Sequence, residues 1–429
     1  PNIKMKNKMK YIAAVSAAST ITFSAFAADA DAGNEKPQSW WERESPVLEE
    51  ATNRLLPDSG FTPVLTWTGE TWSSLSGGLK HGTIFDSLIT FGFEQDIEKL
   101  SGVKNAGRIG LTAFYYAQSG NFENYLSGMS AASNIFSGKM TRVFEIYYAN
   151  EFETGAGNFA FRVGQLAADE DFMGLDYADV FLNSSFGAIP VNADLGLANG
   201  RMAFSQYSLA TFGATAEYAY EDFSIKLGLY NGDAGDDVAS NHGFDYNLHD
   251  VAFWYALSYN YSIAGLGGTV VFGGNLHTGE FENLRNGGTA ANFYSFYLAI
   301  QQDLLCDDEG NPILGAFCRL AYTPSSEIAT YSKYIDAGLN WFAPFKSRPD
   351  DVLALGVSAV NTTKNARNYA ENEGERLGKY ETCVELTYKC QITKSFSVQP
   401  DLQMYFYPES RSGDRQTSLV FGARAELNF

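Results

Sequence analysis

Apolar and polar side chains alternate at the end of the chain. From residue 417 to 429 every second side chain is apolar, and these positions are Leu419, Phe421, Ala423, Ala425, Leu427 and Phe429. The positions between them include Arg424, Glu426 and Asn428. Because successive side chains of a strand point to opposite faces, such a strand has one face suited to hydrocarbon and one suited to water. The segment therefore predicts a strand in the wall of a membrane-spanning β-barrel.

The same alternation recurs in sixteen segments. Most of them reach the 9 to 11 residues that a tilted strand needs to cross a bilayer. The expected strands cover residues 64–75, 83–97, 106–117, 141–152, 157–166, 210–220, 222–231, 249–262, 267–278, 290–303, 314–323, 333–343, 351–362, 378–393, 394–407 and 417–429. Because an open sheet edge is costly in hydrocarbon, the strands should close. The pattern predicts an all-β fold, a 16-stranded antiparallel transmembrane β-barrel with an aqueous channel.

The connections between these segments differ in length in a regular way. With both termini on the periplasmic side, the short connections include 153–156, 263–266 and 344–350, whereas the outer loops are longer. The third outer loop, residues 167–209, is far longer than the others and carries apolar residues of its own. A loop of this length is rarely left without structure. We expect it to fold inward as a constriction loop and to narrow the lumen.

The first sixty residues predict two segments that precede the barrel. Residues 1–27 have a basic start and a small, apolar middle, and Ala25-Phe26-Ala27 fits a cleavage site, so they read as a signal peptide. Residues 28–60 are expected to form an N-terminal periplasmic segment with a short helix, because Pro46 suits its first turn and Pro57 its end; the alternative is a loosely ordered lead-in. The transmembrane β-barrel then covers residues 61–429.

Composition and charge narrow the class of protein. Removal of residues 1–27 leaves 26 basic residues against 50 acidic residues, a net charge of about −24. This charge argues against nucleic acid as a partner. Together with export, it indicates the Gram-negative outer membrane, whose lipid and lipopolysaccharide would surround the barrel. The four cysteines are expected to be free. Cys383 and Cys390 lie about 23 Å apart along one expected strand and cannot bond each other, whereas Cys306 and Cys318 flank a turn and could be closer.

Several short sequence segments resemble those of a known family. They are GGLKHG (77–82), RVGQLAADEDF (162–172), VFLNSSFG (180–187), YNGD (230–233), LGAFCRLAYTP (314–324), RPDDVLALGV (348–357), VELTYKCQI (384–392) and VQPDLQMYFYP (398–408). In this order, over nearly the whole mature chain, they resemble the carbohydrate-selective porin family named for OprB. The resemblance implies a sixteen-stranded outer-membrane barrel that passes sugars, as mono- or small oligosaccharides, by facilitated diffusion.

The candidate site consists of polar and aromatic groups that strand parity turns inward. A diffusion channel needs groups that replace part of a sugar's hydration without holding the sugar too long. The expected substrate-binding residues are Arg108, Glu145, Arg162, Asp169, Glu170, Asp171, Lys226, Arg319, Arg424, Trp254 and Tyr297. Arg162 is the leading candidate, because it begins the segment that leads into Asp169, Glu170 and Asp171 on the constriction loop. The alternative for each charged residue is that it pairs with a neighbouring charge and lines the water-filled lumen without contacting the sugar.

The same residues allow a few alternatives to a sugar channel. The closest alternative is a general diffusion porin for small hydrophilic solutes without sugar preference. An enzyme is not expected, because none of the four histidines has a recognisable Ser or Asp partner pattern. We expect no cofactor and no metal; Asp233, Asp236, Asp237 and Asp245 could supply calcium ligands, but their spacing favours a solvated acidic loop. The sequence leaves monomer and homotrimer open.

Overall fold

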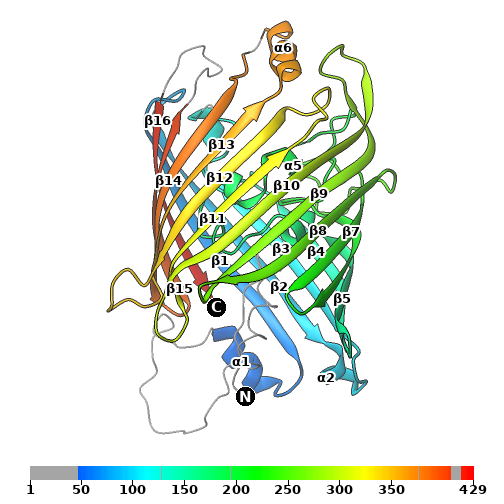
Figure 1. Ribbon diagram of the computed structural model, residues 1–429, viewed down its shortest axis with the longest axis vertical. Coiled ribbons are helices and arrows are strands. Elements are labelled where there is room, and N and C mark those ends of the chain that lie inside the picture. Colours follow the sequence, from blue (N-terminus) through cyan, green and yellow to red (C-terminus); the bar gives the residue numbers. More distant parts are fainter. Residues whose placement is uncertain (1–46, 127, 194, 375, 407–416) are drawn as a thin grey trace.

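The chain forms one closed barrel of sixteen strands (Figure 1). The computed structural model describes residues 47–126, 128–193, 195–374, 376–406 and 417–429. The strands are β1 (Phe61–Ser76), β2 (Gly82–Asp96), β3 (Arg108–Gln118), β4 (Thr141–Thr154), β5 (Gly157–Leu166), β6 (Thr211–Tyr220), β7 (Phe223–Asn231), β8 (Val251–Ile263), β9 (Leu266–Glu282), β10 (Thr289–Cys306), β11 (Pro312–Tyr322), β12 (Tyr331–Phe342), β13 (Val352–Thr362), β14 (Tyr380–Thr393), β15 (Phe396–Phe406) and β16 (Thr417–Asn428). The all-β, sixteen-stranded prediction is confirmed, with strand ends shifted by a few residues.

Every strand pairs antiparallel with its neighbours in sequence, and the last strand closes on the first. In the closing pair Thr66 lies opposite Asn428, and Glu70 lies opposite Arg424. Some periplasmic connections are tight; only residues 394–395 separate β14 from β15. Closure leaves the sheet without an edge, so the backbone groups of every strand have partners on both sides.

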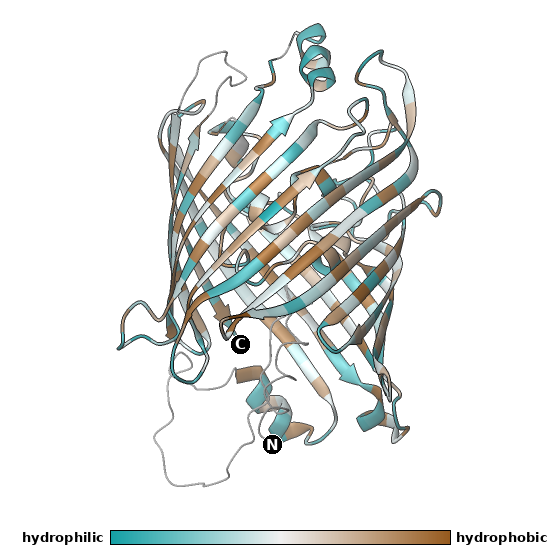
Figure 2. Ribbon diagram, in the orientation of Figure 1, coloured by the Kyte–Doolittle hydropathy of each residue, from teal (hydrophilic) through white to brown (hydrophobic). Residues whose placement is uncertain are grey.

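The wall has the two faces that the alternation predicts. Along β10, Tyr294 and Phe296 are exposed whereas Ser295 and Tyr297 are buried. On β12, Ile335 and Trp341 are exposed and Asp336 is buried. Figure 2 shows hydrophobic and hydrophilic positions alternating along the visible strands. The outward faces therefore suit lipid, and the inward faces carry the polar groups of the bore.

Helices are few and short in the part of the chain that the structure describes. The expected helix before the barrel is present as α1 (Val47–Leu55), while residues 1–46, with the predicted signal peptide, lie outside the described residues. Two helices were not predicted: α2 (Ile97–Ser101), which follows β2, and α6 (Lys364–Asn372), which lies in the β13–β14 loop. A 3-10 turn, η2 (Phe122–Asn124), follows β3. Among the described residues, no helix has the length and hydropathy needed to cross a membrane.

Residues 167–210, between β5 and β6, pack against inward-facing side chains of the wall. They contain α3 (Ala168–Phe172), α4 (Ser184–Gly187) and α5 (Pro190–Ala193), and α5 contacts β10, β11 and β12. Their apolar residues form the largest buried cluster with inward-facing residues of the barrel. The hydrophobic core of this protein thus lies between the segment 167–210 and the wall, not between two sheets.

One irregularity changes which side chains of β4 face inward. The register of β3 with β4 shifts between Thr112 and Ala113, so that Phe144 is an extra residue on β4. Because a bulge inserts one residue, strict alternation fails there. Arg142, Phe144 and Glu145 are consequently all buried on the inner side.

Candidate functional site

Arg162 stands at the centre of a charged cluster on the inner wall. It lies on β5, and its Nη2 donates to both carboxylate oxygens of Glu145, at 3.1 and 3.0 Å. Its Nη1 donates to Asp171 Oδ1 of α3, at 3.0 Å. The Arg162 side chain is 23% exposed, whereas both carboxylates are nearly covered. These three predicted residues are brought together, and the cation is the member that still meets solvent.

Asp171 connects this cluster to the next two strands. Its Oδ2 accepts a hydrogen bond from the Tyr230 hydroxyl at 2.8 Å, and its carbonyl accepts one from Lys226 Nζ at 3.4 Å. Lys226 also forms an ion pair with Glu217 at 3.2 Å. Glu170 lies close enough to act on Arg162 electrostatically. Lys226 and Glu170 therefore belong to the same charged region as Arg162.

Asp169 is a loop carboxyl with unequal surroundings for its two oxygens. Oδ2 accepts a hydrogen bond from the Tyr207 backbone N–H at 2.9 Å, while Oδ1 is buried and has no partner among the described residues. Burial raises the pKa of Asp169 to about 7, against backbone N–H groups that lower it. The group can therefore carry a proton near neutral pH, unlike an ordinary aspartate.

Arg319 is inward as predicted, but the segment 167–210 covers it. Its guanidinium pairs with Asp336 of β12 through Nε at 3.0 Å and Nη2 at 2.5 Å. It also donates to the carbonyls of Met173 at 3.0 Å and Phe186 at 2.6 Å. Only 1% of the Arg319 side chain is exposed. The structure thus gives this residue an anchoring contact, and not a surface that a passing solute could touch.

The two predicted aromatic residues are covered in the same way. Trp254 is fully buried and stacks on Phe172, with ring centroids 5.8 Å apart. Tyr297 is buried, and its hydroxyl donates to the Phe172 carbonyl. Both side chains therefore pack against α3, and neither presents a free ring face to the bore for stacking on a sugar.

Arg424 and Arg108 occupy different parts of the inner wall. Arg424 Nε donates to Glu70 across the β1–β16 pair, and its Nη2 donates to Asn134 of the β3–β4 loop. It is 13% exposed. Arg108, at the start of β3, is 46% exposed and lies 3.8 Å from Glu94. Arg424 thus ties a loop to the wall, while Arg108 extends the charge of the Arg162 region toward the periplasmic end.

Three buried charged residues that hold loops were not among the expected site residues. Arg142 donates to Asp237 Oδ1 at 2.7 Å and to carbonyls of residues 208, 238 and 241. Glu385 of β14 accepts the backbone N–H groups of Leu182, at 2.6 Å, and Asn183, at 3.0 Å. Glu381 accepts those of residues 129 and 130. The bulge in β4 hid the orientation of Arg142, and no local pattern identifies the loop that a wall carboxylate will hold.

The acidic outer loop is organised by an arginine. Arg201 forms ion pairs with Asp233 at 2.8 Å, Asp236 at 3.4 Å and Asp245 at 3.7 Å. The described part of the chain contains no cluster of three or more His, Cys, Asp or Glu residues arranged to hold a metal ion. The guanidinium thus supplies the positive charge that these carboxylates require.

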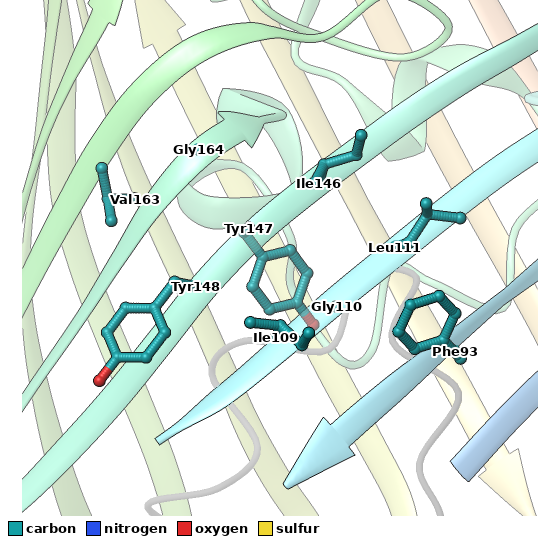
Figure 3. A pocket seen from close by; sticks show the side chains of 9 residues that line it. All are labelled: Phe93, Ile109, Gly110, Leu111, Ile146, Tyr147, Tyr148, Val163 and Gly164. Atoms are coloured by element: carbon teal, nitrogen blue, oxygen red, sulfur yellow. The ribbon is translucent and has the colours of Figure 1, made fainter. Parts of the chain in front are cut away.

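A shallow groove of about 380 Å³ lies on the outer side of β2–β5 (Figure 3). Its lining is mostly apolar and consists of Phe93, Ile109, Gly110, Leu111, Ile146, Tyr147, Tyr148, Val163 and Gly164. Ile109 and Ile146 are among the exposed hydrophobic residues of the wall. Tyr147 is the exception in this lining, because its ring lies on the inner wall and it borders the groove between Gly110 and Gly164, which carry no side chain. The outward-facing residues of the lining direct the groove toward lipid.

Comparison with known proteins identifies the family. The family described as carbohydrate-selective porin, OprB family, matches residues 81–429. No curated protein sequence matches the chain. The high-pH structure of OprB from Pseudomonas putida superposes with a TM-score of 0.79 at 18% identity, covering 91% of this chain and 100% of that chain.

The low-pH structure of the same protein has a TM-score of 0.57 at 14% identity, covering 90% of this chain and 99% of that chain. At such identities the solved structures support the fold, whereas the family match extends over most of the sequence. From that match, with sixteen closed strands and a polar inner wall, it follows that the chain belongs to the OprB family of carbohydrate-selective outer-membrane porins.

Proposed function

We propose that sugars cross this outer-membrane porin through a bore narrowed by residues 167–210, and that they meet the Arg162 cluster at the narrow part. The chemistry is passive transport, which requires no cofactor. The substrates are mono- or small oligosaccharides, and the surroundings are outer-membrane lipid and lipopolysaccharide. Residues 1–27 remain our predicted export signal, and residues 28–60 our predicted periplasmic segment.

The contacts of residues 167–210 with the wall support the narrowing. Leu182 and Asn183 are held by Glu385, and the Asn183 amide also donates to Gln403 at 3.1 Å and Tyr405 at 2.7 Å. Gln399 donates to the Val180 carbonyl at 2.7 Å. These wall residues come from the inward faces of β14 and β15, so the segment occupies cross-section that water would otherwise fill.

The β3–β4 loop also contacts the segment 167–210, which supports the proposed narrowing. Ser184 N donates to the Ala131 carbonyl at 3.0 Å, and Ala131 N donates to Ser184 Oγ at 2.9 Å. Gln403 accepts from Asn183 and donates to the Ala132 carbonyl at 2.8 Å. The β3–β4 and β5–β6 loops are therefore joined to each other and to one wall residue, and we propose that they narrow the bore together.

Partial exposure of Arg162 is the single observation that carries the proposed sugar contact. Glu145 and Asp171 engage its two Nη groups, and among the described residues no acceptor faces its Nε–H. A guanidinium has five N–H donors, so it keeps capacity for a sugar hydroxyl. The adjoining carboxylates hold the cation in place, and a solute that binds through a few such hydrogen bonds can also leave.

Planar-bilayer recording of the Arg162→Ala variant tests this proposal. We expect a larger single-channel conductance and weaker block by sugars, with the barrel folded as before. Arg285→Ala is a matched control, because Arg285 is an exposed arginine of an outer loop that pairs with Glu327. Equal sugar block in Arg162→Ala and the unmodified protein would remove Arg162 from the sugar path.

Liposome swelling addresses the alternative of a general diffusion porin. Sugars and amino acids of equal size should enter at different rates if the bore prefers sugars. Equal rates for the two classes would instead favour a size filter. The same vesicles report whether monosaccharides pass faster than disaccharides, and cross-linking in the membrane distinguishes the monomer from the homotrimer.

A further inference from the structure

The ring of Tyr147 lies against backbone on the inner wall. Its register partners on both neighbouring strands are glycines, Gly110 on β3 and Gly164 on β5. A Cβ atom added at Gly110 would lie 2.7 Å from Tyr147 Cε1 and closer still to Cζ. Figure 3 shows the Tyr147 ring extending from its own strand toward Gly110. A glycine in a strand often marks such a close approach, and here it lets the ring lie where a side chain would otherwise stand.

The other face of the ring carries Arg162. Arg162 Cζ lies 4.3 Å from the centroid of the Tyr147 ring, which is the geometry of a cation–π contact. The Tyr147 hydroxyl donates to Glu94, which in turn faces Arg108 at 3.8 Å. The ring is therefore fixed at three points: by backbone beneath it, by a carboxylate at its tip and by a guanidinium above it.

We propose that Tyr147 is a positioning residue that sets the height and tilt of the Arg162 guanidinium above the wall. This inference rests on the proposed contact of sugars with Arg162. It assigns to Tyr147 an effect on how strongly sugars are held, exerted through Arg162 and without contact between the ring and the solute. Gly110 is part of this arrangement, because its lack of a side chain provides the space in which the Tyr147 ring lies.

The carboxylates alone do not fix the guanidinium fully. Glu145 and Asp171 bind the Nη groups along two edges of the guanidinium plane. Rotation about the line through these contacts would still swing Nε toward or away from the wall. The Tyr147 ring blocks the inward swing and attracts the cation through its π face. Removing the ring leaves an open space beside the glycine backbone, into which Arg162 can fold.

Two substitutions of Tyr147 separate the ring from its hydroxyl. In Tyr147→Phe the ring remains, and we expect sugar block close to that of the unmodified protein. In Tyr147→Leu the π face is lost, and we expect the dissociation constant for the blocking sugar to rise about fivefold. Single-channel recording with glucose as the probe measures this constant separately from the conductance without sugar. A merely structural change would lower the yield of folded channels and leave the block of the surviving channels unaltered.

Gly110→Ala tests the same placement of the Tyr147 ring without changing an aromatic residue. The new methyl group would displace the Tyr147 ring, so weaker sugar block is expected, as in Tyr147→Leu. Gly268→Ala is the matched control, since a Cβ there would lie 2.7 Å from Cε2 of Tyr261, on the outward face. Sugar block that is unchanged in Gly268→Ala and weakened in Gly110→Ala supports the proposal.

The outcomes distinguish this inference from the proposed function beneath it. If Arg162→Ala leaves sugar block unchanged, the sugar contact itself is wrong. If Arg162→Ala weakens block while Tyr147→Leu and Tyr147→Phe both retain it, the contact stands and the positioning role is overturned. If Tyr147→Phe is as weak as Tyr147→Leu, the hydroxyl, and not the ring, positions Arg162, and the stacking proposal is likewise overturned.

Discussion

Replacement of Arg319 by methionine should release the segment 167–210 from the wall. Arg319 is 1% exposed and its partner Asp336 is 0% exposed, so the variant leaves an uncompensated carboxylate in a covered site. Breaking a buried ion pair in this way costs about 3 to 5 kcal/mol. The substitution also removes the donors for the carbonyls of Met173 and Phe186, which are the direct ties to the segment.

The expected effect on the channel follows from this free energy. Part of the cost is recovered, because the Tyr334 hydroxyl still donates to Asp336 at 2.9 Å. A net loss of about 3 kcal/mol in docking raises the population of undocked segment by about a hundredfold. Single-channel recording of Arg319→Met should therefore show long visits to a state of higher conductance, which the unmodified protein reaches rarely. The barrel itself should persist, since all sixteen strand pairings remain.

A second variant separates the effect of the buried charge from that of the lost carbonyl contacts. Replacing both partners, Arg319→Met with Asp336→Leu, removes the stranded charge, and such apolar replacements are often neutral for stability. We expect the double variant to be closer to the unmodified protein than Arg319→Met is. A single variant with ordinary conductance would show that the anchor contributes little. A double variant as open as the single one would show that the lost ties to the carbonyls of Met173 and Phe186 matter more than the buried charge.

Three further expectations follow from the structure. Glu385→Gln leaves one of the N–H groups of Leu182 and Asn183 without an acceptor, at a cost of about 1 to 3 kcal/mol. Open-channel current noise should therefore rise, and noise no greater than in the unmodified protein would show that Glu385 does not hold the segment 167–210. Burial raises the pKa of Asp169 from its ordinary value near 3.8 to about 7, so its contribution to docking is present below about pH 4 and is lost as pH rises to about 7. Conductance should therefore fall from pH 8 to pH 5, and an equal fall in Asp169→Asn would contradict this origin. Cys383 is buried and Cys306 is partly exposed, so a maleimide should label Cys306 first in the intact barrel, and equal labelling rates would argue against the described packing.

The barrel wall was predictable because its signal is local. Each strand separates hydrocarbon from water, so the inward position of Asp336 and the outward position of Trp341 follow from residue spacing alone. The proximity of Arg162 to Asp171 was also within reach, since nine residues separate them in one segment of sequence. Patterns of this kind need no knowledge of distant contacts.

What the sequence could not provide was the path of the loops. Arg319 and Trp254 are inward, as parity requires, yet α3 and α4 decide that neither meets the bore. Arg142 escaped notice because an extra residue in β4 reverses the alternation around it. Tyr147 acquires its position from Gly110, a glycine on another strand, and such a relation appears only when the register is known.

The pairing of β1 with β16 has a consequence for assembly. Thr66 pairs with Asn428, which lies 362 residues further along the sequence, so β1 has a strand partner on only one side until β16 docks. Without β16 the sheet has two open edges, one on β1 and one on β15. Burial of the wall in hydrocarbon therefore depends on this one long-range pairing, and a chain in which β16 is undocked is the form most open to pairing with another copy.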